Sequence, residues 1–173
     1  MSLVLHFADE AGLAQALALE LGWACAQITR HSFPDGEYRL TLPKPLPPRV
    51  ALLRGLQQPN AKLAALLIAA PTARECGARH LTLVAPYLSY MRQDMEFNPG
   101  EAVSQRHVGH ALATWFDALI TVDPHLHRVA TLDEVVPGRR GVALSAAPLL
   151  GHFVAHRVPG ALLLAPDEEA GQW

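Results

Sequence analysis

The sequence predicts an α/β domain built around a mostly parallel sheet that is covered by helices. Two observations carry this prediction. Short apolar runs alternate along the chain with stretches whose apolar residues recur at helical spacing. Half of the 173 residues are apolar, which is enough for one full domain with a sizeable core and a fragment of a second.

The strands are expected where short apolar runs occur. These runs cover residues 3–7, 25–28, 50–53, 81–85 and 118–122. One more strand is expected after the turn at residues 34–36. There Tyr38, Leu40 and Leu42 alternate with polar residues, as they would in an exposed edge strand.

Helices are expected between these runs. Asp9 is placed to cap a first helix that ends at Gly22, a suitable C-terminal cap. Asn60 is placed to cap a second helix. Pro71 lies inside that helix and predicts a kink or a division into two pieces, because proline lacks an N–H and clashes with the preceding turn. A third helix is expected over residues 103–116.

The later part of the chain suggests a second unit. Residues 86–101 are expected to form a long polar loop within the first unit. The alternation of elements then restarts, with a helix over 146–155 and a strand over 161–164. We therefore expect a first domain over residues 1–142 and the truncated start of a second over residues 143–173.

Composition excludes several classes of function. The net charge is −2 with both signs mixed along the chain, unlike the clustered Lys and Arg of a nucleic-acid-binding surface. The apolar runs are too short to span a bilayer, and the start shows no secretory signal pattern. Cys25 and Cys76 stand far apart in the sequence. We expect a reduced, cytoplasmic protein with inert thiols that binds neither nucleic acid nor a membrane.

Two polar segments directly follow predicted strands, where ligands of parallel α/β sheets sit. Residues 86–94 (PYLSYMRQD) offer Arg92 for phosphate oxygens, although an ordinary surface loop with an Arg–Asp pair explains them equally well. In residues 121–128, Asp123 and His125 are two apart. They could share a divalent cation, or they could be a capping Asp and a solvated His.

A third segment, Phe33-Pro34-Asp35-Gly36-Glu37, is by itself an ordinary exposed turn. Together the three segments resemble the ribose-phosphate pyrophosphokinase (phosphoribosyl pyrophosphate synthetase) family, and the resemblance covers essentially the whole chain. The matching stretches are FPDGE at 33–37, YMRQD at 90–94, PGEAVS at 99–104, DPH at 123–125 and PD at 166–167.

The resemblance implies a three-layer phosphoribosyltransferase-like domain followed by a truncated second domain. It also implies a reaction in which the β,γ-pyrophosphoryl group of Mg-ATP is transferred to the 1-hydroxyl of ribose 5-phosphate. The products would be phosphoribosyl pyrophosphate and AMP. Such a transfer depends chiefly on positioning and on neutralisation of charge. Because the family builds its sites across subunits, the resemblance implies a homo-oligomer.

The resemblance also assigns roles to residues of this chain. Phe33 would stack on adenine, and Asp35 and Glu37 would accept hydrogen bonds from its amine or support the loop. The ATP-binding residues that it implies are Phe33, Asp35, Glu37, Arg92, Gln93 and Asp94. His125 and Asp167 would place Mg²⁺.

The chain also departs from the family pattern. Met95 and Glu96 stand where the family has two basic residues, and Pro124 replaces a leucine. The family's basic catalytic loop and its ribose 5-phosphate loop would lie beyond Trp173, and no lysine follows Lys62. We therefore expect no catalytic residue in this chain and no catalysis by this chain alone.

Two alternatives remain open at this point. A non-catalytic regulatory or assembly homologue would keep the fold and the interface, and the substitutions at Met95 and Glu96 favour it. A metal-dependent hydrolase could be built on Asp123, His125 and His127, but it would need further ligands from other strand ends.

Overall fold

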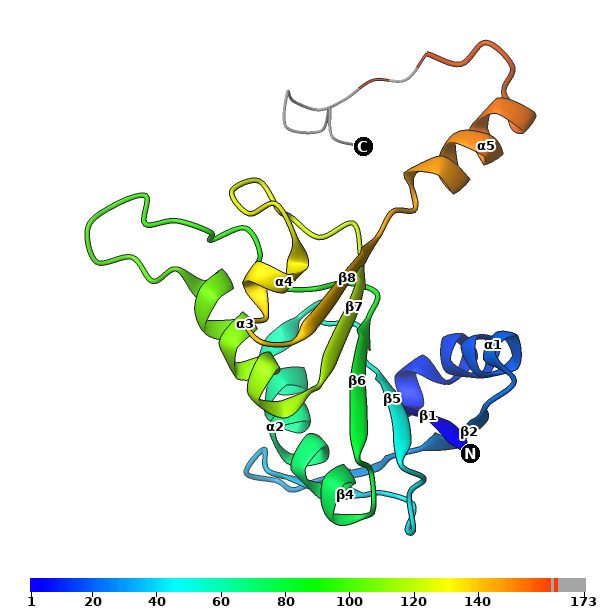
Figure 1. Ribbon diagram of the computed structural model, residues 1–173, viewed down its shortest axis with the longest axis vertical. Coiled ribbons are helices and arrows are strands. Elements are labelled where there is room, and N and C mark those ends of the chain that lie inside the picture. Colours follow the sequence, from blue (N-terminus) through cyan, green and yellow to red (C-terminus); the bar gives the residue numbers. More distant parts are fainter. Residues whose placement is uncertain (163, 165–173) are drawn as a thin grey trace.

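A six-stranded sheet forms the centre of the computed structural model, which describes residues 1–162 and 164 (Figure 1). The strand order is β2-β1-β5-β6-β7-β8, and every neighbouring pair is parallel. The strands are β1 Ser2–His6, β2 Ala24–Gln27, β5 Arg49–Leu53, β6 His80–Ala85, β7 Ala118–Val122 and β8 Arg140–Leu144. The predicted parallel sheet is confirmed.

Helices cover the sheet in two layers, because successive side chains of a strand point to opposite faces. Val4 of β1 packs against Ala14 and Ala18 of the first helix, α1 (Ala11–Leu21). Leu5 belongs to the main core on the other face. That face is covered by α2 Pro59–Glu75, α3 Ser104–Trp115 and α4 Leu132–Val135. In Figure 1, α1 lies across the strands from these three helices, so the predicted α/β layering is confirmed.

The start of α1 differs from the prediction. Residues 8–10 form a short 3-10 helix, η1, and α1 begins only at Ala11. Asp9 is not a side-chain cap. Its Oδ1 pairs with Nη1 of Arg54 at 2.6 Å, and the Arg54 side chain is only 1% exposed. A buried guanidinium needs a carboxylate partner, which explains why the Asp9 side chain points toward Arg54 and does not cap the helix. Gly22 ends the helix in the left-handed conformation, as predicted.

Helix α2 also differs from the prediction in two details. It begins at Pro59, so Asn60 lies in its first turn, where its side-chain oxygen accepts a hydrogen bond from the Tyr90 hydroxyl. Of the two outcomes predicted at Pro71, the division into two pieces is wrong, because the helix is continuous there, and the kink stays a prediction. The carbonyl that loses its partner there belongs to Leu67, which is exposed on the surface, so water can satisfy it.

Apart from η1, three elements were not predicted. Strand β3 (Thr29–Ser32) pairs antiparallel with β4 (Tyr38–Thr41) to form a separate two-stranded sheet, and α4 and β8 are the other two. The strand predicted over residues 161–164 is wrong for Ala161, Leu162 and Leu164, which are in no strand. Residue 163 lies outside the described residues.

The last described helix, α5 (Ala147–Arg157), buries none of its residues. Its position agrees with the predicted helix over residues 146–155. Figure 1 shows it projecting from the end of β8, away from the sheet and from the helices that cover it. Its large apolar side chains Leu149, Leu150 and Phe153 are exposed. None of the helices in the described part of the chain is long and apolar enough to cross a membrane.

Candidate functional site

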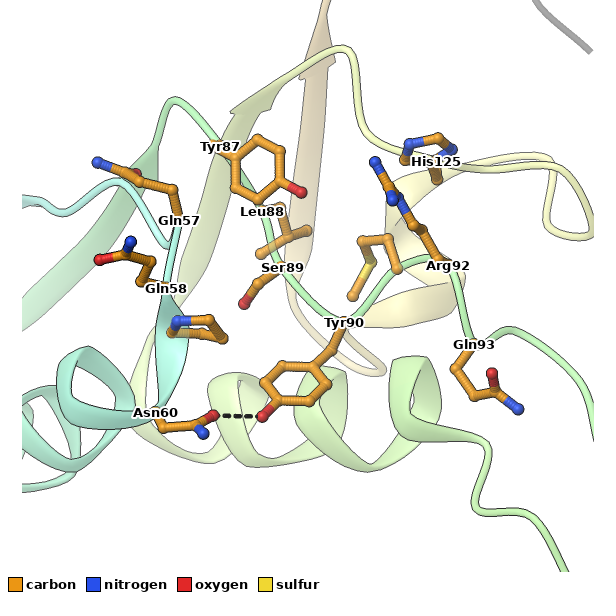
Figure 2. A pocket seen from close by; sticks show the side chains of 12 residues that line it. Gln57, Gln58, Asn60, Tyr87, Leu88, Ser89, Tyr90, Arg92, Gln93 and His125 are labelled. Carbon is orange, nitrogen blue, oxygen red and sulfur yellow. Dashed lines mark hydrogen bonds between the residues drawn. The ribbon is translucent and has the colours of Figure 1, made fainter.

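A cavity of about 560 Å³ opens at the carboxyl ends of β5, β6 and β7. Residues 57–60, after β5, form one wall, and residues 87–93, after β6, form another. His125, after β7, completes the lining (Figure 2). This is the edge at which ligands of parallel sheets bind, and the volume is typical of a small-molecule site.

The loops around this cavity contain strained backbone. Three non-glycine residues in the described part of the chain have positive φ: Gln58 (53°), Tyr90 (64°) and Asp123 (43°). They lie in the loops after β5, β6 and β7, respectively. Such conformations cost about 1–3 kcal/mol each and persist at sites where the surroundings enforce them. One enforcing contact is the hydrogen bond from the Tyr90 hydroxyl to Asn60, with 2.5 Å between the oxygens.

Three of the residues expected from the sequence meet at the cavity. Arg92 and Gln93 come from the loop after β6, and His125 comes from the loop after β7. In Figure 2, Arg92 and His125 lie close together on one side of the cavity. Ser89 also lines the cavity, and its buried hydroxyl oxygen has no hydrogen-bond partner among the described residues. The arrangement offers a cation, an amide and an imidazole to one ligand.

Asp94 does not line this cavity. Its side chain is 1% exposed, and its Oδ1 pairs with Nη1 of Arg128 at 2.8 Å. It borders a second, smaller cavity of about 220 Å³, which shares Arg92 and His125 with the first. The Arg128 guanidinium also lies over the Phe97 ring, 5.7 Å from its centroid.

The FPDGE segment lies elsewhere. Phe33, Asp35 and Glu37 are in the turn between β3 and β4, and none of them lines either of these two cavities. The turn is closed by its own contacts: the Phe33 amide donates to the Glu37 carbonyl, and the Glu37 amide donates to the Asp35 carboxylate at 3.1 Å. Phe33 is 39% exposed. Within one chain, this segment therefore does not join the cavity residues.

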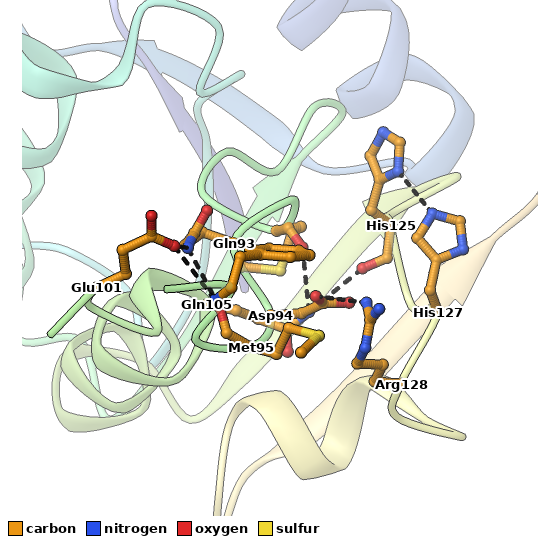
Figure 3. A network of polar contacts seen from close by, with 10 residues as sticks. Gln93, Asp94, Met95, Glu101, Gln105, His125, His127 and Arg128 are labelled. Carbon is orange, nitrogen blue, oxygen red and sulfur yellow. Dashed lines mark hydrogen bonds and ion pairs between the residues drawn. The ribbon is translucent and has the colours of Figure 1, made fainter. Parts of the chain in front are cut away.

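Asp123 and His125 do not face the same cavity. The left-handed backbone of Asp123 turns its Oδ2 to accept a hydrogen bond from the Ala146 amide at 3.1 Å, and Asp123 borders neither cavity. His125 Nδ1 lies 3.1 Å from His127 Nε2 (Figure 3). The described residues contain no group of three His, Cys, Asp or Glu side chains placed to hold a metal ion. Asp167, expected as a metal ligand, lies outside them.

Hydrogen bonds to Glu101 organise the loop that carries Met95 and Glu96. Its carboxylate accepts from the Asn98 side chain at 2.6 Å and from the backbone amides of Asn98 and Phe97. These donors hold the pKa of Glu101 below its usual value, the Asn98 side chain having the largest effect. The Glu96 carboxylate accepts from the Gly100 amide. Neither Met95 nor Glu96 lines the larger cavity.

Gln105 is a site residue that the sequence prediction missed. It lies on α3, is 5% exposed, and its Nε2 lies 3.3 Å from both the Met91 carbonyl and the His125 carbonyl. Its backbone amide donates to the Gln93 carbonyl at 3.1 Å. A glutamine buried in a helix indicates hydrogen-bond partners, but the sequence does not reveal which ones.

Comparison with known proteins gives a consistent result. A family model described as the N-terminal domain of ribose phosphate pyrophosphokinase matches residues 3–115. The ribose-phosphate pyrophosphokinase of Methanopyrus kandleri is 37% identical over 97% of this chain and 57% of its own length. That of Halobacterium salinarum is 32% identical over 97% of this chain and 58% of its own length. The chain thus spans a little over half the length of these curated relatives.

A solved structure shows a similar fold. The crystal structure of phosphoribosylpyrophosphate synthetase from Mycobacterium smegmatis superposes with a TM-score of 0.79. The match covers 90% of this chain and 52% of that one, at 22% sequence identity. At this identity, the likeness supports the fold alone.

Proposed function

Because this chain belongs to the ribose-phosphate pyrophosphokinase family, we propose that it forms the ATP-binding part of such an enzyme. The complete protein would transfer the pyrophosphoryl group of Mg-ATP to ribose 5-phosphate, giving phosphoribosyl pyrophosphate and AMP. The observation that carries the proposal is the convergence of Arg92, Gln93 and His125 at one cavity. These residues come from two loops that are far apart in the sequence.

The chemistry of these side chains suits a nucleotide polyphosphate. The Arg92 guanidinium can donate two parallel hydrogen bonds to phosphate oxygens, which gives strength and direction. Gln93 offers both donors and an acceptor, although its amide nitrogen also donates within the loop to the Met95 carbonyl and to Glu101. In this proposal these groups fix the triphosphate in one orientation, and orientation is the main requirement for transfer of a phosphoryl group.

Magnesium belongs to the proposal only as part of Mg-ATP. The described residues do not by themselves fit a magnesium site, because they hold no cluster of three metal-binding side chains and Mg²⁺ prefers oxygen ligands. An ion that takes most of its ligands from the triphosphate and water would need few from this chain. His125 at the cavity and Asp167 are the contacts that the resemblance suggests.

The position of Phe33 bears on the proposed assembly. If Phe33 stacks on adenine, it must come from another copy of the chain, because in its own chain it lies away from the cavity. This supports a homo-oligomer in which the β3–β4 turn of one subunit completes the site of a neighbour. Cys25 and Cys76 form no disulfide, which supports the cytoplasm as the proposed compartment.

A second candidate function is a non-catalytic homologue of the enzyme. Glu96 stands where the resemblance expects a basic residue, and its carboxylate binds the Gly100 amide of its own loop. The loop therefore lacks two positive charges that would help to neutralise a polyphosphate. A polypeptide of the length of the curated relatives would decide between the candidates, since only the enzyme would form AMP from ATP and ribose 5-phosphate.

Calorimetric titration with Mg-ATP tests the proposed function. We expect saturable binding, weakened by about tenfold or more in Arg92→Ala, because a hydrogen bond to a charged group contributes about 1.5–3 kcal/mol. Arg106→Ala is the matched control, because Arg106 is exposed on α3 and lies outside the cavity. The affinity of this variant for Mg-ATP should stay within about twofold of the wild-type value. An unchanged affinity in Arg92→Ala would contradict the proposed site.

A further inference from the structure

Residues outside the cavity must fix the distance between two of its side chains, Arg92 and His125. Arg92 follows β6, and His125 follows β7, so the spacing of the two side chains depends on how two separate loops are tied together. A Mg-polyphosphate that contacts both residues needs this spacing fixed to within a fraction of an ångström. Figure 3 shows the contacts that cross between these loops.

The first contact that links the two loops is made by the side-chain amide of Gln105. Its Nε2 lies 3.3 Å from the carbonyl of Met91, the residue before Arg92, and 3.3 Å from the carbonyl of His125 itself. The backbone amide of Gln105 also donates to the Gln93 carbonyl. One residue of a rigid helix thus contacts the backbone on both sides of Arg92 and at His125.

The second contact that links the two loops is an ion pair. Asp94 lies two residues after Arg92, and Arg128 lies three residues after His125. Their side chains meet at 2.8 Å, and the Asp94 carboxylate is buried. A buried carboxylate with a guanidinium partner resists separation, because breaking the pair would leave a charge without compensation.

We propose that Gln105 is a positioning residue of the nucleotide site and that, together with the Asp94–Arg128 pair, it sets the spacing between Arg92 and His125. The inference rests on the proposed function for its consequence in ligand binding. It gives Asp94 a different role from the ATP contact expected from the sequence. Asp94 acts on the nucleotide through the loop that it anchors, and Arg92 makes the contact.

The chemistry requires an amide at position 105. A glutamine NH₂ carries two donors, and here each has one carbonyl within reach. Methionine has a similar length and no donor, so Gln105→Met leaves both carbonyls without that partner. An ionised glutamate would repel them, whereas a protonated glutamate could donate to one.

The test combines Mg-ATP titration with backbone NMR of the same variants. We expect Gln105→Met to weaken binding by about tenfold and to shift the amide resonances of both Arg92 and His125. At pH 8, Gln105→Glu should also bind more weakly than wild type, because an ionised glutamate repels both carbonyls.

Each outcome is informative. Affinity within twofold of wild type in Gln105→Met would overturn the proposal, as would a loss of affinity without shifted amide resonances at Arg92 and His125. If wild type does not bind Mg-ATP, the proposed function fails. The NMR shifts still test whether Gln105 links the loops that carry Arg92 and His125. Coupled shifts at Arg92 and His125 would support it, and shifts at neither would refute it.

Discussion

At the scale of single residues, one exposed carboxylate orders the loop beside the cavity. Glu101 accepts hydrogen bonds from the Asn98 side chain and from the Asn98 and Phe97 amides, and these donors lower its pKa. It also accepts from the Gln93 side chain. The loop that carries the two substituted positions, Met95 and Glu96, is therefore held by charge-assisted hydrogen bonds.

The first prediction concerns the pH dependence of this loop. A lowered pKa in the folded state means that the ionised form of Glu101 stabilises the loop above its usual pKa of 4.5 and that this stabilisation disappears as the pH falls through the lowered value. We expect the Asn98 and Phe97 amides to exchange hydrogen faster in Glu101→Gln than in wild type at pH 7. At pH 3 the difference should be smaller. An equal difference in exchange rate between Glu101→Gln and wild type at pH 7 and at pH 3 would contradict a stabilising role for the ionised Glu101.

At the scale of elements, α4 packs unusually close to α3. A Cβ added at Gly109 of α3 would lie 2.0 Å from the Val135 carbonyl oxygen. On the other side of α4, a Cβ at Gly141 would lie 2.7 Å from the Leu132 carbonyl carbon. These two glycines let a four-residue helix sit between α3 and β8, and α4 begins directly after the loop that carries His125.

The second prediction follows from this packing. Alanine normally stabilises a helix interior by about 1 kcal/mol relative to glycine, but Gly109→Ala should destabilise the protein by about 1–3 kcal/mol, because α4 must move. Urea unfolding measures the effect. Gly12→Ala in α1 is the control: its Cβ would meet nothing within 4 Å, so it should be neutral or slightly stabilising. A stabilised Gly109→Ala would show that α4 is not packed as described.

Most elements could be predicted from the sequence, because buried strands and long helices leave clear apolar patterns. The three missed elements lack such patterns. Strand β3 (TRHS) is polar and exposed along its whole length, α4 has one turn, and β8 is a partly exposed edge strand without alternation. The start of α1 was misplaced, because the partner of Asp9 is Arg54, 45 positions along the chain.

The cavity could be predicted in part. Arg92, Gln93 and His125 follow strand ends, and parallel strands bring those ends to one edge of the sheet. The sequence could not reveal that Asp94 turns toward Arg128, 34 positions away, or that Gln105 joins two loops. Both depend on tertiary contacts between side chains that share no local pattern.

At the scale of the whole molecule, the residues expected to bind ATP are split between two places. The β3–β4 turn with Phe33 is separate from the cavity with Arg92. A chain that contributes one half of a site to its own cavity and the other half to a neighbour can still form complete sites when two defective chains are mixed.

The third prediction tests this sharing. Phe33→Ala and Arg92→Ala should each weaken Mg-ATP binding. An equal mixture of the two, dissociated and reassembled at random, should recover tight binding at about a quarter of the sites, because those sites receive both wild-type halves. Calorimetry of the mixture measures the recovered stoichiometry. No recovery, or a monomeric protein in analytical ultracentrifugation, would place Phe33 outside the site.

The strand order has a consequence for how the protein is made. Apart from β2, which lies on the outer side of β1, the sheet grows in chain order from β1 through β5, β6 and β7 to β8. A chain that leaves the ribosome N-terminus first can therefore add each strand to a neighbour that is already present, without waiting for a distant partner. At each stage, the strand on the growing side of the sheet, whose outer backbone groups are still unpaired, is the one that the next strand pairs with. The loop that carries Arg92 can take up its position only after β6 has joined the sheet, and the loop that carries His125 only after β7 has.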